Sequence, residues 1–278
     1  MAIASYGFMF FSCTGTMVAI GGATALDTLC GQALTSTNNP TILGLFLQQC
    51  IVILLLIFGL LITPIWLLSG RLFIALGQDF EILAMMAARL DNDSIGAQSI
   101  LKSSSLLLTT ISLGLSVAAS HRIANFLGAN RGSLAPTAIT ASYLLAFLTG
   151  AIEFAVIMLA RRHYGYPFTR SPSVATKTAR VLPLMAAFQV LDLSNGAAGG
   201  VLRGAGKNHL SGACNFVAYY GVGLTTGYLF WFQRGWGLFG LWAGIIAGSG
   251  ALLLLQTACI MRISWDELGR EVSKRHQP

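Results

Sequence analysis

The residues best suited to chemistry lie in one mostly apolar stretch, Ala186–His209, which carries a single carboxylate, Asp192, near its middle. If this stretch is helical, Gln189, Asp192 and Asn195 fall on one narrow polar face, three residues apart. An ionisable group in hydrocarbon costs several kcal/mol, so Asp192 should face protein or a water-filled cavity. We interpret it as a candidate proton or cation site, with a hydrogen-bonded packing residue as the alternative.

A second acid, Glu153, lies well inside another apolar stretch, Pro136–Ala160. No motif claims Glu153, so a structural role and a functional role both stay open. Withdrawal from water favours the neutral form of a carboxyl group. An intramembrane acid is therefore a candidate functional group, and Asp192 is the leading such candidate in this chain.

The composition indicates what kind of protein must hold these acids. Of the 278 residues, 55% are hydrophobic and only 10% are charged, and the mean hydropathy is +0.70. Soluble domains carry about 25% charged residues, so we predict a polytopic integral membrane protein whose partner is the lipid bilayer. The apolar runs far exceed the roughly ten residues of a barrel strand. The fold class should therefore be all-α, a transmembrane helical bundle.

Charge and sequence patterns exclude several other classes. The net charge of +7 comes mostly from basic residues between apolar runs, as in membrane loops, and predicts no nucleic-acid partner. The five cysteines show no CxxC or Cys/His spacing, which indicates neither a disulfide framework nor a zinc site. The sequence shows no Ser/His or paired-Asp motif, so we expect no enzyme, no metal and no cofactor. We also expect no cleavable signal peptide, because the start lacks a basic region.

Seven apolar stretches are long enough to be transmembrane helices. Pro183 can kink the fifth stretch, and Gly240, Gly244 and Gly248 in the seventh form a small-residue face that predicts close helix contact. The seven stretches are Gly7–Leu26, Ile42–Leu68, Ile95–Ala119, Pro136–Ala160, Val181–Leu202, Ser211–Phe232 and Trp236–Met261.

Four motifs within these stretches carry a family resemblance. Ala25–Ala33 reads Ala-Leu-Asp-Thr-Leu-Cys-Gly-Gln-Ala, and Val201–Gly206 reads Val-Leu-Arg-Gly-Ala-Gly after the acidic stretch. They resemble the second and tenth helices of the multidrug and toxic compound extrusion (MATE) family, in a eukaryotic, fungal-like form. Ile95–Ser99 and Ser116–Ala129 resemble its eighth helix. Ala25–Leu34 also aligns with Ala118–Leu127, an internal repeat of the kind that transporters contain.

The resemblance implies a secondary active antiporter that exports organic cations or xenobiotics in exchange for protons or Na⁺, the coupling ion being its only cofactor. Asp192 matches the family's acidic position on the tenth helix, where Gln189 and Asn195 would hydrogen-bond the acid or the substrate. Gln98 and Glu153 complete the candidate substrate and proton site. Four further residues of the family motifs are candidates for gating: Asp27, Gln32, Asn125 and Arg203.

The resemblance covers helices two, three and eight to twelve of a twelve-helix, two-lobe fold, with a join near Arg89–Ser94. It implies that residues 1–90 are the remnant of an N-terminal lobe with two transmembrane helices and an amphipathic loop. Residues 91–263 form a five-helix C-terminal lobe, and residues 264–278 form a charged, solvated cytoplasmic tail. We expect the five helices to pack as one bundle, and Gly7–Leu68 to pack poorly against it because its family neighbours are missing.

Other interpretations stay open at this point. A truncated, non-transporting fragment or a faulty gene model would explain the missing helices. A seven-span receptor would explain the number of apolar stretches, although not the motifs or the repeat. Basic residues divide equally between the two sides, eight against eight, so charge does not decide the orientation. The substrate, the oligomeric state and the choice between plasma and vacuolar membrane are not fixed by the sequence.

Overall fold

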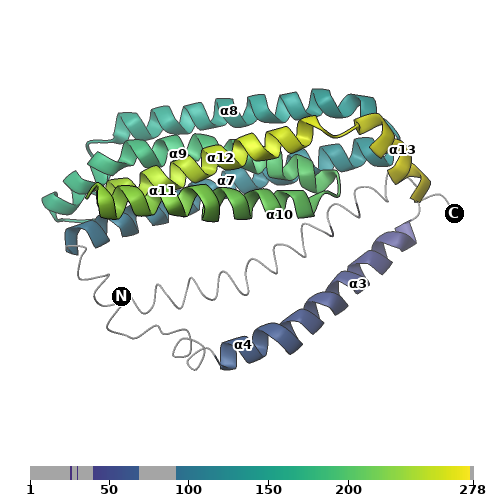
Figure 1. Ribbon diagram of the computed structural model, residues 1–278, viewed down its shortest axis with the longest axis horizontal. Helices are drawn as coiled ribbons and strands as arrows, with labels where there is room; N and C mark the ends of the chain where they lie inside the picture. The colour runs from purple at the N-terminus through teal and green to yellow at the C-terminus, as the bar shows by residue number, and fades with distance from the viewer. Residues whose placement is uncertain (1–25, 27–29, 31–39, 69–91, 276–278) are drawn as a thin grey trace.

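The computed structural model describes residues 26, 30, 40–68 and 92–275, and nearly all of these residues are helical (Figure 1). The elements, in chain order, are α3 (Pro40–Ile57), η2 (Phe58–Ile62), α4 (Thr63–Leu67), α7 (Asn92–Gly128), η3 (Gly132–Leu134), α8 (Ala135–Ala160), α9 (Pro172–Gly204), α10 (Asn208–Phe216), η4 (Val217–Gly223), α11 (Leu224–Tyr228), η5 (Leu229–Gln233), α12 (Leu238–Met261) and α13 (Trp265–Arg275).

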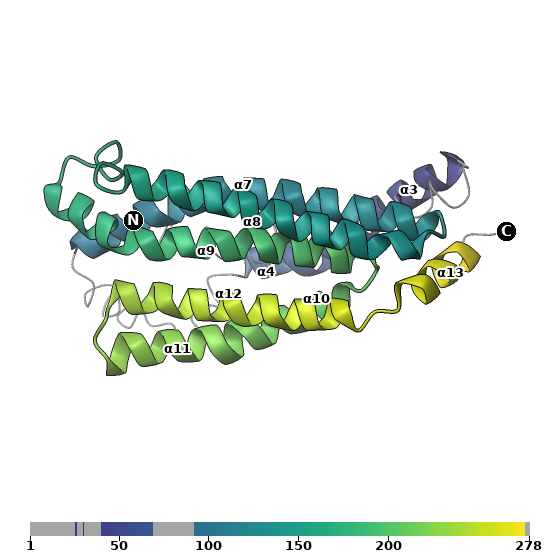
Figure 2. The ribbon, with the colours of Figure 1, turned by 90° about the horizontal axis from the view of Figure 1, so that it is seen from above.

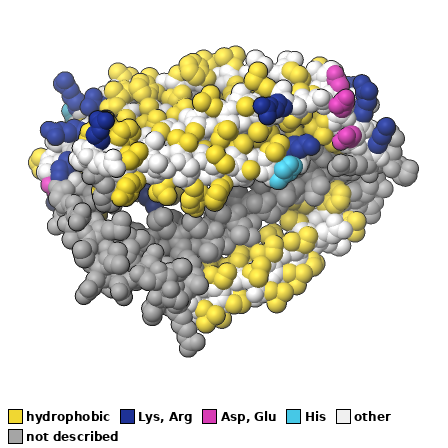
Figure 3. Space-filling view, viewed as in Figure 1, with side chains coloured by type: hydrophobic (Ala, Val, Ile, Leu, Met, Phe, Trp, Pro, Cys, Tyr) yellow, Lys and Arg dark blue, Asp and Glu magenta, His cyan; other side chains and the backbone are white. Residues whose placement is uncertain are grey.

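The described helices confirm the all-α membrane fold. Five of them are long and apolar enough to cross a bilayer: Gly44–Leu67, Asp93–Gly128, Gly132–Ala160, Pro172–Gly204 and Leu238–Met261. The predicted sixth span is a rod of alternating α- and π-helix, α10 to η5. The predicted first span, Gly7–Leu26, lies almost entirely outside the described residues. Figure 3 shows hydrophobic side chains over much of the bundle's flank and many Lys and Arg side chains toward its two ends, as a membrane protein requires.

Helix α9 forms the centre of the bundle. It packs against α7, α8 and α12, and these helices enclose it in Figures 1 and 2. The predicted kink site, Pro183, lies inside α9, where it removes the N–H that would bond the carbonyl of Ala179. Arg161, at the end of α8, donates its Nε–H to that carbonyl at 2.7 Å. A neighbouring helix thus satisfies the acceptor that proline leaves open, so the helix can continue.

The α7–α9 contact is built from serines on one helix and glycines on the other. Added Cβ atoms at Gly196, Gly200 and Gly204 would overlap Ser112, Ser116 and Ser120 respectively. Both series advance by four residues in the same direction, so the two helices run parallel. Small residues allow two helix backbones to approach closely, which is how helices associate in lipid. This row of glycines was not predicted. In the sequence, Gly196 stands directly after Asn195 of the polar face, which obscures the four-residue spacing of the three glycines.

The α12 glycines confirm the predicted close contact. A Cβ at Gly248 would lie 3.0 Å from the Cα of Gly223, and one at Gly244 would overlap Gly227. A Cβ at Gly240 would lie 2.8 Å from the carbonyl carbon of Phe230. The small-residue face of α12 therefore packs along the α10–η5 rod.

The region from α3 to α4 is far less enclosed than α9. Ile62 is its one buried residue among those whose burial is described. Figure 1 shows this segment, α3 to α4, which we call the α3–α4 rod, apart from the bundle. No extensive contact joins it to the helices of residues 92–275. This agrees with the expectation that the second span packs poorly.

The C-terminal tail differs from the solvated segment that we predicted. It forms α13, whose Val272 is buried and whose Trp265 and Leu268 pack on the hydrophobic cluster at the ends of α7 and α9. Gly132 permits this contact, because a Cβ there would overlap the carbonyl of Trp265. Trp265, Leu268 and Val272 lie among charged residues in the sequence but share one face of α13, and this apolar face packs on the bundle.

Candidate functional site

The predicted polar face of α9 divides between two neighbouring helices. The Gln189 side chain is 1% exposed and accepts a hydrogen bond from the Ser105 hydroxyl of α7 at 3.3 Å. Asn195, 8% exposed, donates its Nδ2–H to the Ser249 carbonyl of α12 at 3.1 Å. Asp192 lies between these two amides along α9. Two fixed amides therefore flank the acid, one held by each neighbouring helix.

Asp192 itself is half-buried against the hydroxyl-rich side of α7. The Ser112 hydroxyl donates to the main-chain carbonyl of Asp192 at 3.0 Å, and Thr109 and Ser112 both lie next to its carboxyl group. The Oδ2 atom of Asp192 is buried and has no hydrogen-bond partner among the described residues. A buried carboxylate oxygen without a partner costs free energy, so this atom is suited to bind a proton or a cation.

Glu153 approaches the same region from α8. It is 8% exposed, and neither of its carboxyl oxygens has a hydrogen-bond partner within the part of the chain that the structure describes. Its carboxyl group lies near that of Asp192. Gly150, one turn away on α8, makes this approach possible, because a Cβ there would lie 2.9 Å from the Cα of Val190. Two acids from adjacent helices thus share one poorly solvated region.

Two further polar residues extend this region, and we did not predict them. The Tyr219 hydroxyl on η4 pairs with the Ser249 hydroxyl at 3.2 Å and lies near the Asp192 carboxyl group. Gln256 on α12 is 2% exposed and donates Nε2–H to the Ser211 hydroxyl at 3.2 Å, while its buried Oε1 has no partner in the described chain. Ser249 and Gln256 stand seven residues apart on α12, and this helical spacing within an apolar stretch is the signal that could have revealed Gln256.

The remaining predicted site residues lie elsewhere. Gln98 accepts a hydrogen bond from the indole Nε1–H of Trp242 at 2.9 Å, about 20 Å along α7 from the level of Ser112. Asn125 is exposed near the end of α7. Arg203 donates to the Ser116 hydroxyl, joining the end of α9 to α7. Asp27 and Gln32 lie outside the described residues.

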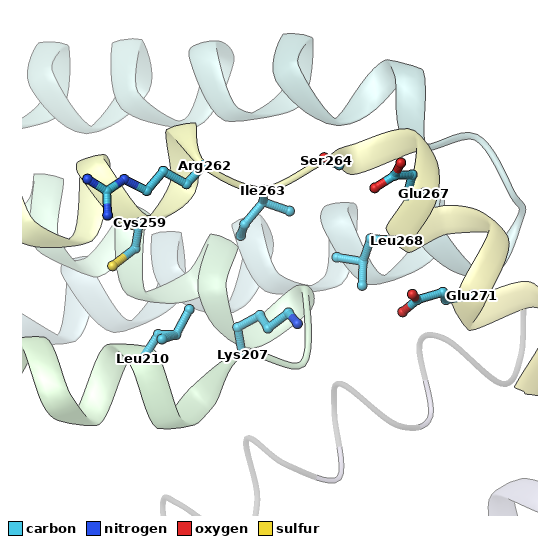
Figure 4. A pocket seen from close by; sticks show the side chains of 9 residues that line it. All are labelled: Lys207, Leu210, Cys259, Arg262, Ile263, Ser264, Glu267, Leu268 and Glu271. Atoms are coloured by element: carbon cyan, nitrogen blue, oxygen red, sulfur yellow. The ribbon is translucent and has the colours of Figure 1, made fainter.

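A pocket of about 420 Å³ opens at the end of the bundle where α10, α12 and α13 meet (Figure 4). None of the predicted site residues lines it. The lining residues are Lys207, Leu210, Cys259, Arg262, Ile263, Ser264, Glu267, Leu268 and Glu271.

The fold is that of a polytopic helical membrane protein, and its bundle holds two intramembrane acids. The MatE family model matches the chain in two stretches, residues 1–86 and 80–229. The chain belongs to this family, the multidrug and toxic compound extrusion family, whose members are transporters and not enzymes. The two matched stretches meet a few residues before the join expected near Arg89–Ser94.

Known relatives support the same assignment. The chain is 33% identical over 189 residues to an uncharacterized transporter of Schizosaccharomyces pombe, covering 68% of this chain and 35% of that protein. It is 32% identical over 187 residues to multidrug and toxin extrusion protein 1 of Homo sapiens, covering 67% and 33%. The crystal structure of the eukaryotic MATE transporter AtDTX14 superposes with a TM-score of 0.65 at 28% identity, over 71% of this chain and 45% of that one. The chain thus spans about a third of the length of the curated relatives that it matches.

Proposed function

We propose that this chain is a MATE-type secondary active antiporter that exports organic cations in exchange for protons or Na⁺, with Asp192 as the principal anionic contact. The observation that carries the proposal is the pair of acids at the centre of the bundle. Asp192 and Glu153 come from adjacent helices, lie near each other and keep buried carboxyl oxygens without partners among the described residues. Such a pair favours an added positive charge, which a proton, a metal cation or an organic cation can supply.

The surrounding residues give the acid a defined geometry. Ser105 and Ser249 hold the amides of Gln189 and Asn195 on either side of Asp192. The Oδ1 atom of Asn195 is buried and has no partner in the described part of the chain. An amide oxygen and a carboxylate one turn apart can together accept hydrogen bonds from a protonated amine. Exchange follows from competition, because a proton and an organic cation cannot both neutralise the same carboxylate.

One other function has specific support, namely that of a non-transporting fragment of a MATE protein. The α3–α4 rod has one buried residue among those described and no extensive contact with the bundle. The part of the chain that matches its relatives covers about a third of their length. Alternating access requires one lobe to move against another, so a chain with one packed five-helix bundle would bind a cation without transporting it.

Counterflow in proteoliposomes tests the proposal. The full chain is reconstituted, loaded with an unlabelled organic cation and exposed to a fluorescent one, under imposed pH or Na⁺ gradients in turn. We expect wild type to exchange the cations and Asp192→Asn to lose the exchange. Asp93→Asn, which removes a carboxylate at the start of α7, is the matched control and should exchange normally. Binding without counterflow in wild type would favour the non-transporting fragment.

A further inference from the structure

Two cysteines meet where the α10–η4 segment packs against α12. The Sγ atoms of Cys214 and Cys259 are 3.7 Å apart, although the residues are 45 positions apart in sequence. Cys214 is buried in a cluster with Ala218 and Leu252, and Cys259 packs against that cluster. Two polar pairs also join the two segments: Ser211 with Gln256 and Tyr219 with Ser249. The two thiols are therefore held face to face by the packing of their helices.

We propose that Cys214 and Cys259 form a redox-active dithiol that closes to a disulfide by exchange with a small-molecule disulfide. A disulfide bond is about 2.05 Å long, so the sulfur atoms need to approach by less than about 2 Å. No change of register between α10 and α12 is required for that movement. The proposal concerns a modification site separate from Asp192 and does not depend on transport.

The pocket at the end of the bundle gives a small disulfide its access. Cys259 lines this pocket, together with Lys207 and Arg262 (Figure 4). Figure 4 also shows the two acids of the pocket, Glu267 and Glu271, on α13 and away from Cys259. Lys207 and Arg262 give the pocket two cationic side chains that can pair with the carboxylates of an anionic disulfide such as oxidised glutathione.

The positions of the two thiols assign their order of reaction. The Cys259 thiolate attacks one sulfur of the small disulfide, forms a mixed disulfide and releases one small thiolate. The Cys214 thiolate then attacks the Cys259 sulfur and releases the second small thiolate. In total, two protein thiols and one small disulfide give one protein disulfide and two small thiols. Two protein sulfurs are oxidised, the small disulfide is reduced, and the two thiol protons pass to the released thiolates.

Mass spectrometry on the intact chain tests this reaction. The purified full-length protein in detergent is incubated with oxidised glutathione, its remaining thiols are blocked with N-ethylmaleimide, and it is digested without reductant. We expect a cross-linked peptide pair that joins Cys214 to Cys259 and disappears with dithiothreitol. In Cys214→Ser, Cys259 should keep its glutathione adduct, because the second thiol is missing. Cys50→Ser, on α3, is the matched control and should still form the cross-link.

The wild-type result decides the proposal even if a variant fails to fold. A wild-type protein in which Cys259 carries glutathione but does not link to Cys214 overturns it. So does a protein in which both thiols stay reduced while the other cysteines react. A cross-link that forms equally with Cys50 would show that the pairing does not depend on the α10–α12 contact, and would also overturn the proposal.

Discussion

The α3–α4 rod is more apolar than helix α9 but far less buried, which is the reverse of what is found in water-soluble proteins. The most apolar part of the rod has a mean hydropathy of 2.8, yet 6% of its residues are buried. The corresponding part of α9 has a mean hydropathy of 1.2, and 56% of its residues are buried. In water, the more apolar helix would be the central one. In lipid, apolar surface gains nothing from leaving the solvent, so small and polar residues decide which helix lies inside.

The residues of the two helices explain the difference. Helix α9 carries Gly196, Gly200 and Gly204 toward α7 and its polar side chains toward α7 and α12. The rod instead presents large side chains such as Leu55 and Leu60, which are 67% and 70% exposed. A hydropathy profile finds both helices, but only the pattern of small and polar residues distinguishes the one that packs from the one that faces lipid.

The largest expected effect comes from deleting one large side chain in each helix. Leu193 on α9 is 1% exposed and packs against Ala146 and Ala197. Leu193→Ala should therefore cost about 2–5 kcal/mol of stability, because it leaves a cavity. Leu55→Ala, on the α3–α4 rod, should leave stability nearly unchanged. The midpoint of thermal aggregation in detergent measures both, and equal losses would show that the rod is as well packed as α9.

A smaller effect is expected from adding one methyl group to a glycine. Gly200→Ala places its Cβ against the main chain of Ser116, and overpacking of this kind costs about 1–3 kcal/mol. Gly44 on α3 has no heavy atom of another residue within 4 Å of an added Cβ. Gly44→Ala should thus be neutral or slightly stabilising through helix propensity. A stable Gly200→Ala variant, measured by the same aggregation assay, would contradict the close α7–α9 contact.

The smallest effect concerns Gln98 and separates structural from functional polar residues. Gln98→Leu removes the acceptor of the Trp242 indole N–H, which should cost about 1 kcal/mol. Gln48→Leu, at an exposed position of α3, should cost nothing. Cation affinity should stay unchanged in both variants, because Gln98 lies about 20 Å along α7 from the level of Ser112. If Gln98→Leu lost cation affinity and Gln48→Leu did not, Gln98 would be part of the binding site, contrary to this prediction.

Much of the fold follows from the sequence because lipid limits the possible elements. Every backbone group in a bilayer must be satisfied within its own element, so each apolar stretch predicts one helix. The extent of α7 was harder to predict, since the apolar stretch ends at Ala119 but the helix continues to Gly128. The docking of α13 was missed because Leu268 and Val272, on its apolar side, lie among charged residues. Its contact with the bundle is a tertiary contact, which the amino-acid composition of the segment does not predict.

The candidate site was predictable only in part. Asp192, Gln189 and Asn195 follow from one helical face and from the family resemblance. That Glu153 reaches the same region depends on the close approach of α8 at Gly150, which no periodicity reveals. Tyr219 joins the site through its bond to Ser249 across two helices. Such convergence comes from the way the helices pack, so it requires the structure.

The central claim is that Asp192, within the packed bundle, binds an organic cation in place of a proton. The direct test is the affinity of the purified full-length chain for a fluorescent organic cation, with proton release recorded in weak buffer on both sides of neutral pH. We predict that wild type binds more tightly as pH rises and releases protons on binding, because only the carboxylate attracts the cation. Asp192→Asn should lose at least about tenfold in affinity and the proton release with it, whereas Asp93→Asn should match wild type. Unchanged affinity and unchanged proton release in Asp192→Asn would contradict the claim.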